Sequence, residues 1–455
     1  MGFFKAYDMR GTFGADFDLE TVRRVGLALP RVVGGKRWLI GRDCRTTSND
    51  VAAALKEGLQ LAGADVYDLG ESTTPMVYYF TSIDDYDGSV MITASHNPPS
   101  DNGLKVSRKL STPVGYADGL DKVEELVGGD NLEVSPERGG VHILDHDQAL
   151  GSYATFLEEL TRSISLSGLR YAVDCSNGMA SMLVHRLFPG AVVINDTLDG
   201  SFPAHSPNPL NPEARKQIAS VVRENKLHCG IIFDGDADRA MFVDENGDFV
   251  QSDYLIPLVA ASCLSSRTSP SSQSEKPVVL HDVRTSRGVV ETLEEMGCTP
   301  FMVRVGHAFA KPAMRKLSAL CGGELAGHYY FGDFFKCDSG ILAALRILGE
   351  ISKGLERGVS FSSLVSPIAS RYDNSGEINF EVEDKDAATE RVLSAASTLS
   401  TITGRSDIDG VRLEFVDGWI NVRKSNTEPY LRLVAECRGD VKPWVKVLSA
   451  AVTGR

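Results

Sequence analysis

The sequence predicts an α/β protein with three similar mixed-sheet domains, followed by a C-terminal α+β domain. Three observations support this prediction. A unit of strand, strand-end aspartate, helix and strand occurs three times, with the aspartates at Asp43, Asp174 and Asp282. Beyond about residue 370 the pattern changes to closely spaced strands. The chain has 455 residues, which is more than one hydrophobic core accommodates.

The first unit, residues 1–149, carries an unusual loop after a buried strand. Ser89-Val90-Met91-Ile92 is an apolar run that we interpret as the strand, and Thr93-Ala94-Ser95-His96-Asn97-Pro98 follows it. Because proline has no N–H for a sheet ladder, we expect the strand to end here and Ser95 to lie in the loop that follows it. Taken alone, this stretch is more often a turn whose hydroxyl binds its own backbone.

The second and third units, residues 150–251 and 252–369, follow the same order and also carry a loop after a later strand. Because such sheets bind ligands beyond the carboxyl ends of their strands, we expect the three loops to face one cleft between domains. The elements predicted for the three units are strands over 37–40, 65–70, 170–173, 191–194, 229–233, 278–280 and 300–305, and helices over 51–62, 180–188 and 287–296.

The last unit, residues 370–455, has the pattern of an antiparallel sheet. Its predicted elements are a helix over 386–399 and strands over 411–415, 419–423 and 430–437. A Ser- and Pro-rich stretch over 265–277 is typical of a solvated surface loop.

Three carboxylates lie at alternate positions in the loop of the second unit. Asp234, Asp236 and Asp238 follow the apolar run Gly230-Ile231-Ile232-Phe233. Close carboxylates repel one another unless a hard cation joins them, and oxygen ligands suit Mg²⁺. A calcium loop is a poor alternative, because the later acidic ligands of that motif are missing. A solvated acidic turn is also disfavoured, since the apolar run buries the base of the loop.

Composition argues against nucleic acid and a membrane as binding partners. The net charge of −14 argues against nucleic acid, whose phosphates select basic surfaces. Neither a signal sequence nor an apolar run of about 18 residues is present, which argues against a membrane. The eight cysteines form no Cys-x-x-Cys pair, so we expect a reduced, cytoplasmic protein.

Four stretches together resemble the α-D-phosphohexomutase superfamily, in its phosphomannomutase/phosphoglucomutase branch. They are Thr93-Ala94-Ser95-His96-Asn97-Pro98, Asp234-Gly235-Asp236-Ala237-Asp238-Arg239, Glu324-Leu325-Ala326-Gly327-His328 and Arg423-Lys424-Ser425-Asn426-Thr427-Glu428-Pro429. All four occur in order, across the whole chain. The resemblance implies four domains around a central cleft.

The resemblance also implies a reaction. A phosphoserine at Ser95 gives its phosphoryl group to a hexose 1- or 6-phosphate of mannose or glucose. The bisphosphate turns end for end and returns its other phosphate. The cofactors implied are Mg²⁺, held by Asp234, Asp236, Asp238 and the Ser95 phosphate, and a hexose 1,6-bisphosphate primer. The partners are small hexose phosphates, and the chain is a monomer or a dimer.

Further site residues follow from the same resemblance. Beside Ser95, the catalytic candidates are Arg10, Lys105, Arg239 and His328. The substrate-binding candidates are Arg284, His307, Glu324, His328, Arg423, Ser425, Asn426 and Thr427, with Lys311 as another cleft cation. Without the resemblance, Arg284, His307 and Lys311 are each read as an exposed charge, and His328 as structural. The stretch with Arg423, Ser425, Asn426 and Thr427 is then read as a hairpin turn.

Two enzymatic details and one non-enzymatic alternative stay open. Ala326 stands where the superfamily commonly has serine, which leaves the hexose epimer undecided. A phosphoglucosamine mutase usually has Ser-Gly-Thr where this chain has Ser425-Asn426-Thr427. A sugar-phosphate-binding protein without turnover is the alternative of another class.

Overall fold

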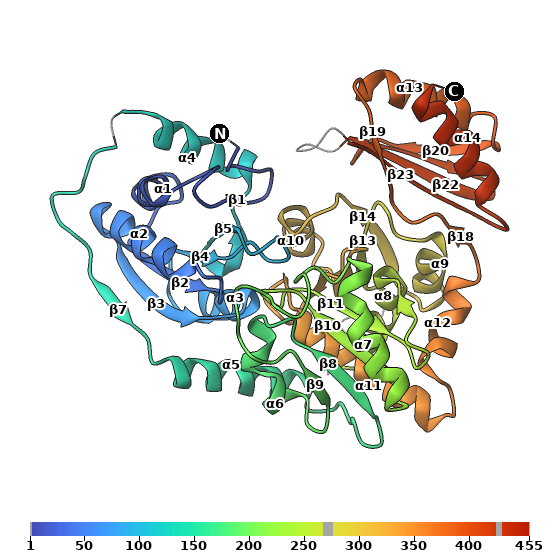
Figure 1. Cartoon of the computed structure of the whole chain (residues 1–455), viewed down its shortest axis with the longest axis horizontal. Helices are drawn as coiled ribbons and strands as arrows, with labels where there is room; N and C mark the ends of the chain where they lie inside the picture. The colour runs from blue at the N-terminus through green and yellow to red at the C-terminus, as the bar shows by residue number, and fades with distance from the viewer. Residues whose placement is uncertain (1, 131, 267–275, 425–429, 455) are drawn as a thin grey trace.

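The computed structural model describes residues 2–130, 132–266, 276–424 and 430–454. Within these residues the strands form four sheets, of seven, five, five and six strands (Figure 1). In the units of the first three sheets, strands and helices alternate along the chain. The fourth sheet has its helices on one side. This confirms the predicted α/β class with a C-terminal α+β unit.

The first three sheets share one topology. A first strand lies at the centre, and the second and third strands pair with it in parallel, one on each side. A fourth strand then pairs antiparallel with the third. From first to fourth, these strands are β2 (Arg37–Arg42), β3 (Asp65–Glu71), β4 (Gly88–Ile92) and β5 (Asp101–Arg108) in the first sheet. In the second sheet they are β8 (Tyr171–Asp174), β9 (Val192–Ile194), β10 (Cys229–Phe233) and β11 (Ala240–Val243). In the third sheet they are β13 (Val278–Asp282), β14 (Thr299–Val303), β15 (Cys321–Gly323) and β16 (Tyr329–Phe331).

The shared topology makes the loop between the third and fourth strands equivalent in all three sheets. This loop carries Ser95 in the first sheet, residues 234–239 in the second and residues 324–328 in the third. The remaining strands lie outside this common unit and are β1 (Met9–Thr12), β6 (Thr112–Pro113), β7 (Val141–Ile143), β12 (Phe249–Val250) and β17 (Cys337–Asp338).

Helices bury the faces of these sheets. Helices α1 (Leu19–Val32) and α2 (Ser48–Leu61) approach closely at Gly26 and Gly58; a Cβ at Gly58 would lie only 2.0 Å from the Arg23 carbonyl oxygen. One apolar cluster continues from the first unit through the second into the third, by way of α3, α5, α8 and α11. The helices are α1 (Leu19–Val32), α2 (Ser48–Leu61), α3 (Thr74–Ile83), α4 (Leu120–Gly128), α5 (His146–Thr161), α6 (Val184–Leu187), α7 (Pro212–Glu224), α8 (Ile256–Ser265), α9 (Arg287–Glu295), α10 (His307–Lys316), α11 (Gly340–Glu356), α12 (Phe361–Ala369), α13 (Lys385–Ala396) and α14 (Lys442–Thr453).

The helix predicted over 180–188 is wrong. The chain there makes a 3₁₀ turn over Met179–Met182 and a single α-helical turn, α6, interrupted at Leu183. Apolar residues three or four apart satisfy a 3₁₀ turn as well as an α-helix, so the spacing did not distinguish the two. Helix α5 runs across the predicted division at 149–150, and we propose to set that division ahead of His146.

The fourth unit has an antiparallel sheet whose apolar face is covered by α13 and α14. It contacts the third unit through buried polar groups: Arg412 donates to the Val283 carbonyl, and the Arg287 N–H donates to Glu436 Oε1 at 2.8 Å. Its strands are β18 (Asp373–Asn374), β19 (Ile378–Glu381), β20 (Ile402–Ser406), β21 (Val411–Phe415), β22 (Gly418–Lys424) and β23 (Tyr430–Cys437).

Two predictions from composition can be compared with the structure. Among the described residues, no helix combines the length and apolar character needed to cross a bilayer. All eight cysteines lie in the described part of the chain, and none forms a disulfide bond.

Candidate active site

Ser95 lies in the loop between β4 and β5 and contacts the second unit directly. Its Oγ donates a hydrogen bond of 2.7 Å to Asp234 Oδ2. The side chain is fully buried, and the residue has φ 52°, in the left-handed region. The Ser95 N–H donates to Thr93 Oγ1 at 2.8 Å. A serine and an aspartate that are 139 residues apart in the sequence therefore form one polar centre.

The two loops approach so closely that only glycine fits between them. A Cβ on Gly235 would lie 2.5 Å from the Ser95 carbonyl oxygen. Burial raises the pKa of Asp234 well above its usual range, and the charges of Asp238 and Asp236 raise it further. The pKa values of Asp236 and Asp238 are lowered instead, so Asp234 is the carboxylate of this loop whose negative charge the protein stabilises least.

The acid cluster fits a divalent cation. Asp234, Asp236 and Asp238 each offer a carboxylate oxygen, and these atoms lie within 4.8 Å of one another. Asp236 Oδ1 and Asp238 Oδ1 are buried and accept no hydrogen bond from any described residue. Buried carboxylate oxygens without a donor are suited to a hard cation such as Mg²⁺.

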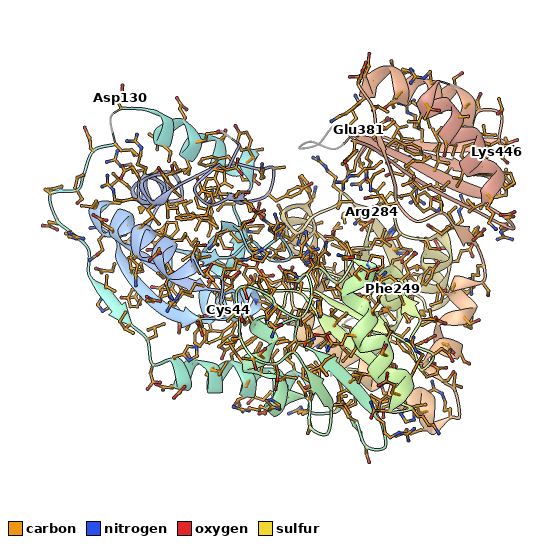
Figure 2. The ribbon with its side chains drawn as sticks, viewed as in Figure 1. Cys44, Asp130, Phe249, Arg284, Glu381 and Lys446 are labelled. Carbon is orange, nitrogen blue, oxygen red and sulfur yellow. The ribbon has the colours of Figure 1, made fainter. Side chains whose placement is uncertain are left out.

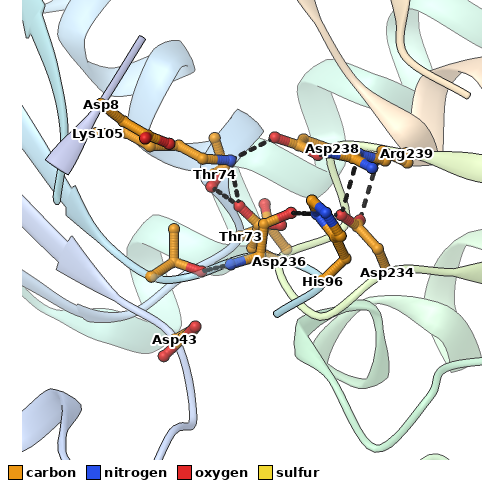
Figure 3. A network of polar contacts seen from close by, with 12 residues as sticks. Asp8, Asp43, Thr73, Thr74, His96, Lys105, Asp234, Asp236, Asp238 and Arg239 are labelled. Carbon is orange, nitrogen blue, oxygen red and sulfur yellow. Dashed lines mark hydrogen bonds and ion pairs between the residues drawn. The ribbon is translucent and has the colours of Figure 1, made fainter. Parts of the chain in front are cut away.

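Lys105 offsets part of this negative charge (Figure 3). It lies on β5, and its Nζ is 2.6 Å from both Asp236 Oδ2 and Asp238 Oδ2. Burial alone would lower the pKa of Lys105, but the two carboxylates outweigh it and raise the pKa. Thr74, at the start of α3, donates its N–H to the Asp236 carbonyl at 3.0 Å and its hydroxyl to the Asp236 carboxylate.

Arg239 connects the acid loop to the third unit. Its Nε donates to His328 Nε2 at 3.0 Å and lies 3.6 Å from Asp234 Oδ2. Because Nε2 of His328 accepts, its Nδ1 carries the proton and donates to Asp338 Oδ2 at 2.8 Å. Lys311 Nζ lies 2.8 Å from the other Asp338 oxygen. A buried chain of polar contacts thus joins the loops of the second and third units.

A cavity of about 460 Å³ opens beside this centre, between the first three units. Five predicted site residues line it: Arg10, Arg239, His307, Glu324 and His328. Tyr7, His96 and Ala326 also line it. The Glu324 carboxylate accepts from the Gly306 N–H at 3.1 Å and from the Tyr330 hydroxyl at 2.5 Å, which orients it toward the cavity.

Two histidines of this cavity have a lowered pKa, which favours the neutral imidazole. Burial lowers the pKa of His96 well below its usual range, and nearby Arg239 and Arg10 lower it further. Burial and then the charge of Lys311 have the same effect on His307. The His96 Nδ1 atom lies 3.4 Å from Ser95 Oγ.

Arg284 and Arg423 lie apart from this cavity, where the third and fourth units meet (Figure 2 labels Arg284). Arg284 binds both oxygens of Asp282, at 3.2 and 2.7 Å. Arg423 Nη2 lies 2.6 Å from Glu377 Oε2. A second cavity of about 540 Å³ lies between Tyr7, the third unit and the fourth unit, so the two cavities together touch all four units.

Of the remaining predicted site residues, three lie outside the described part of the chain and others are more buried than expected. Ser425, Asn426 and Thr427 lie outside the described residues. Taken without the resemblance, Arg284, His307 and Lys311 were read as exposed charges. The structure corrects this: His307 is half-buried, and Arg284 and Lys311 are buried and paired with carboxylates. The identity of one residue in the sequence does not indicate whether its side chain is buried in a pair with a carboxylate.

The sequence reasoning assigned no role to Tyr7, His96 or Asp338. His96 directly follows Ser95, and that position was the available signal. Asp338 lies at the end of the short strand β17, outside the four stretches, and only the fold brings it to His328. Tyr7 is placed by the N-terminal segment, which has no periodic pattern.

Comparisons with known proteins match the whole chain. A phosphomannomutase of Vibrio cholerae is 34% identical over 453 residues, covering 96% of this chain and 95% of the relative. Phosphohexose mutases of Xanthomonas campestris are 35% identical over 441 residues, with the same coverage. Models of the phosphoglucomutase/phosphomannomutase family match in order, as alpha/beta/alpha domain I at residues 1–129, domain II at 152–247, domain III at 251–372 and the C-terminal domain at 377–443.

A solved structure gives the same result for the fold. The crystal structure of a phosphoglucomutase/phosphomannomutase family protein from Burkholderia thailandensis matches with a TM-score of 0.84 at 28% identity. The match covers 100% of this chain and 98% of the other.

Proposed function

The chain belongs to the phosphoglucomutase/phosphomannomutase family and is a phosphohexomutase, and we propose that it interconverts the 1- and 6-phosphates of mannose and glucose through a phosphoserine at Ser95. One observation carries this proposal. The Ser95 hydroxyl, on the first unit, is hydrogen-bonded to the acid cluster of the second at 2.7 Å. A stored phosphoserine beside such a cluster is a ready phosphoryl donor.

In the proposed reaction, the bond between phosphorus and Ser95 Oγ breaks and a new bond forms to the free hydroxyl of the sugar phosphate. The product is a hexose 1,6-bisphosphate, which turns end for end and returns its other phosphoryl group to Ser95. The same bisphosphate, supplied from outside, primes an enzyme that has lost its phosphate.

The acid cluster is proposed to hold Mg²⁺ through Asp234, Asp236 and Asp238, together with the Ser95 phosphate. When bound, this ion neutralises charge on the transferring group. Arg239 supports the proposal, because its guanidinium lies between the acid cluster and the cavity, where it can contact phosphoryl oxygens.

The attacking hydroxyl must lose a proton, and Ser95 Oγ must gain one. Arg10 and Lys105 are poorly suited to accept it, because a guanidinium and an ammonium are already protonated, and each is paired with a carboxylate, Arg10 with Asp8 and Lys105 with Asp236. We therefore assign them to charge stabilisation. His96 Nδ1 lies 3.4 Å from Ser95 Oγ, and His96 lines the cavity, so we propose that it carries the proton between the two oxygens; its lowered pKa favours the neutral form that can accept a proton.

Sugar recognition is assigned to Glu324, His307 and His328. The Glu324 carboxylate is positioned to accept from adjacent sugar hydroxyls. His307 Nδ1 is buried and has no hydrogen-bond partner among the described residues, so it is available to the substrate. Ala326 lines the same cavity without a polar group, and we expect looser discrimination between epimers there.

The non-reacting phosphate needs an anchor at a distance from Ser95. We assign this role to Arg423, Ser425, Asn426 and Thr427, with Arg284 nearby. Arg423 is the penultimate residue of β22, and Lys424 separates it from residues 425–427 in the sequence. Forked guanidinium donors and hydroxyls suit phosphate oxygens.

Substrate turnover tests the proposed function. With Mg²⁺ and a hexose 1,6-bisphosphate primer, we expect mannose 1-phosphate and glucose 1-phosphate both to be converted, each at a higher kcat/KM than glucosamine 1-phosphate. Conversion is measured by the appearance of the 6-phosphate. Turnover of the amino sugar alone would instead identify a phosphoglucosamine mutase.

Replacement of Arg423 by alanine is expected to weaken substrate binding more than it harms the fold. Loss of a charge-assisted hydrogen bond of about 1.5–3 kcal/mol predicts a KM higher by about tenfold or more. Arg405→Ala is the matched control, since Arg405 is an exposed arginine of the same unit paired with Asp407. A melting temperature that collapses while KM holds would contradict the anchor role.

A further inference from the structure

Arg45 is a buried arginine that uses all its donors on the serine loop and one carboxylate. It follows β2, and its side chain has no exposed surface. Nη2 donates to the carbonyl oxygens of Ser95 and Asn97, at 2.8 and 2.7 Å. Nη1 donates to those of Pro98 and Asp101, at 2.6 and 2.9 Å, and Nε donates to Asp43 Oδ2 at 3.1 Å.

These contacts saturate the guanidinium, which has five N–H donors. They also satisfy three carbonyl groups of the irregular loop over residues 93–100, which contains two prolines, and the carbonyl group of Asp101, the first residue of β5. Buried carbonyls without a partner are unfavourable, so this side chain stabilises the loop's conformation, together with the Asp101 N–H, which also donates to the Pro98 carbonyl, at 3.1 Å. Ser95 itself is held at φ 52°, a conformation that persists only when the surroundings determine it.

The second unit closes over the same arginine. The ring of Phe202 lies 5.1 Å from the Arg45 guanidinium carbon. A Cβ on Gly200 would lie 2.5 Å from the Arg45 Cα, so the chain of the second unit touches this turn. Cys44, the preceding residue, marks the junction of the two units in Figure 2, and its Sγ contacts the Asn177 carbonyl at 3.6 Å.

We infer that Arg45 is a positioning residue for phosphoryl transfer, which holds Ser95 Oγ against the acid cluster by fixing the carbonyls of the serine loop. This inference rests on the proposed function of Ser95. Arg45 reaches Ser95 through its backbone carbonyl, and its recorded contacts include neither Oγ nor the cavity. Lysine cannot replace it, because one ammonium has three donors and no planar fork.

The test compares Arg45→Lys with Arg346→Lys. Arg346 is the matched control because its side chain is equally buried, on α11, and bonds to Asp333 away from the serine loop. We expect Arg45→Lys to lower kcat by about a hundredfold, the order expected for a misplacement of about 1 Å, with KM nearly unchanged. Arg346→Lys should destabilise the fold and leave kcat of the folded enzyme within about threefold.

A second readout separates positioning from stability. Intact mass follows the phosphate on Ser95 after mixing the phosphorylated enzyme with sugar phosphate. We expect Arg45→Lys to retain the phosphate but to transfer it slowly, whereas a stability defect alone leaves the transfer rate of folded molecules unchanged. If Arg45→Lys does not fold, the same measurements are made on Asp43→Asn. This variant keeps Arg45 but removes the carboxylate charge that anchors the Arg45 Nε, so we expect its kcat to fall.

Two outcomes would overturn the inference. One is transfer by folded Arg45→Lys at the wild-type rate. The other, should that variant not fold, is an Asp43→Asn enzyme with unchanged kcat. Ser95→Ala is measured in the same series: if it stays active, the proposed function fails, and if it is inactive while Arg45→Lys is normal, only the positioning role fails.

Discussion

Replacement of Ser95 by alanine is expected to abolish nearly all mutase activity and leave the fold intact. The proposed pathway has no other phosphoryl acceptor, so kcat should fall by about 10³-fold or more, as for loss of a covalent nucleophile. Stability should change by only about 1–2 kcal/mol, because the variant loses the hydrogen bond to Asp234 and the long contact with His96 Nδ1. Activity, melting temperature and intact mass are measured together.

Ser100→Ala is the matched control for this variant. Ser100 lies in the same loop, is exposed, and donates to Asp101 at 3.3 Å. Its loss should leave activity unchanged, and the enzyme should still carry one phosphate. Unchanged turnover in Ser95→Ala would disprove the mechanism. A wild-type protein that binds hexose phosphate but never carries a phosphate would favour the binding protein.

Removal of divalent cations is the second change with a large expected effect. Chelation should lower kcat by about two or more orders of magnitude, because a metal ion contributes several kcal/mol of charge stabilisation in such reactions. Added Mg²⁺ should restore activity. It should also raise the melting temperature, since a ligand that binds only the folded state stabilises it.

Asp236→Asn should weaken both the recovery of activity and the rise in melting temperature on addition of Mg²⁺. Asp244→Asn is the control, because Asp244 follows β11 in the same unit and binds the backbone of the adjoining turn. The control should respond to Mg²⁺ like the wild type. Full activity in metal-free enzyme, or a melting temperature of Asp236→Asn that rises with Mg²⁺ as in the wild type, would disprove the metal site.

Much of the arrangement of the site could be predicted from sequence because it follows from repetition. Each unit has an apolar third strand and then a loop of polar or glycine-rich residues, and the same topology brings all three loops together. The strand predicted over 229–233 coincides with β10, because a short buried strand with a clear polar boundary leaves little freedom.

What sequence could not show is what long polar side chains contact. Arg45 and Lys311 look like ordinary surface charges in the printed sequence, and both are buried against partners supplied by other segments. Asp338 and His328 are close in the sequence, but their hydrogen bond depends on the turn before β17. Periodicity reports on apolar faces and carries no information about such pairs.

The apolar clusters have a mechanical consequence. The first three units share one cluster, whereas the cluster of the fourth unit, among the described residues, contains only residues of that unit. Polar contacts such as those of Arg412 and Arg287 join the fourth unit to the third. Relative motion of the third and fourth units at this seam would break polar contacts and leave both apolar clusters intact, so the hydrophobic effect opposes such motion less here than between the first three units.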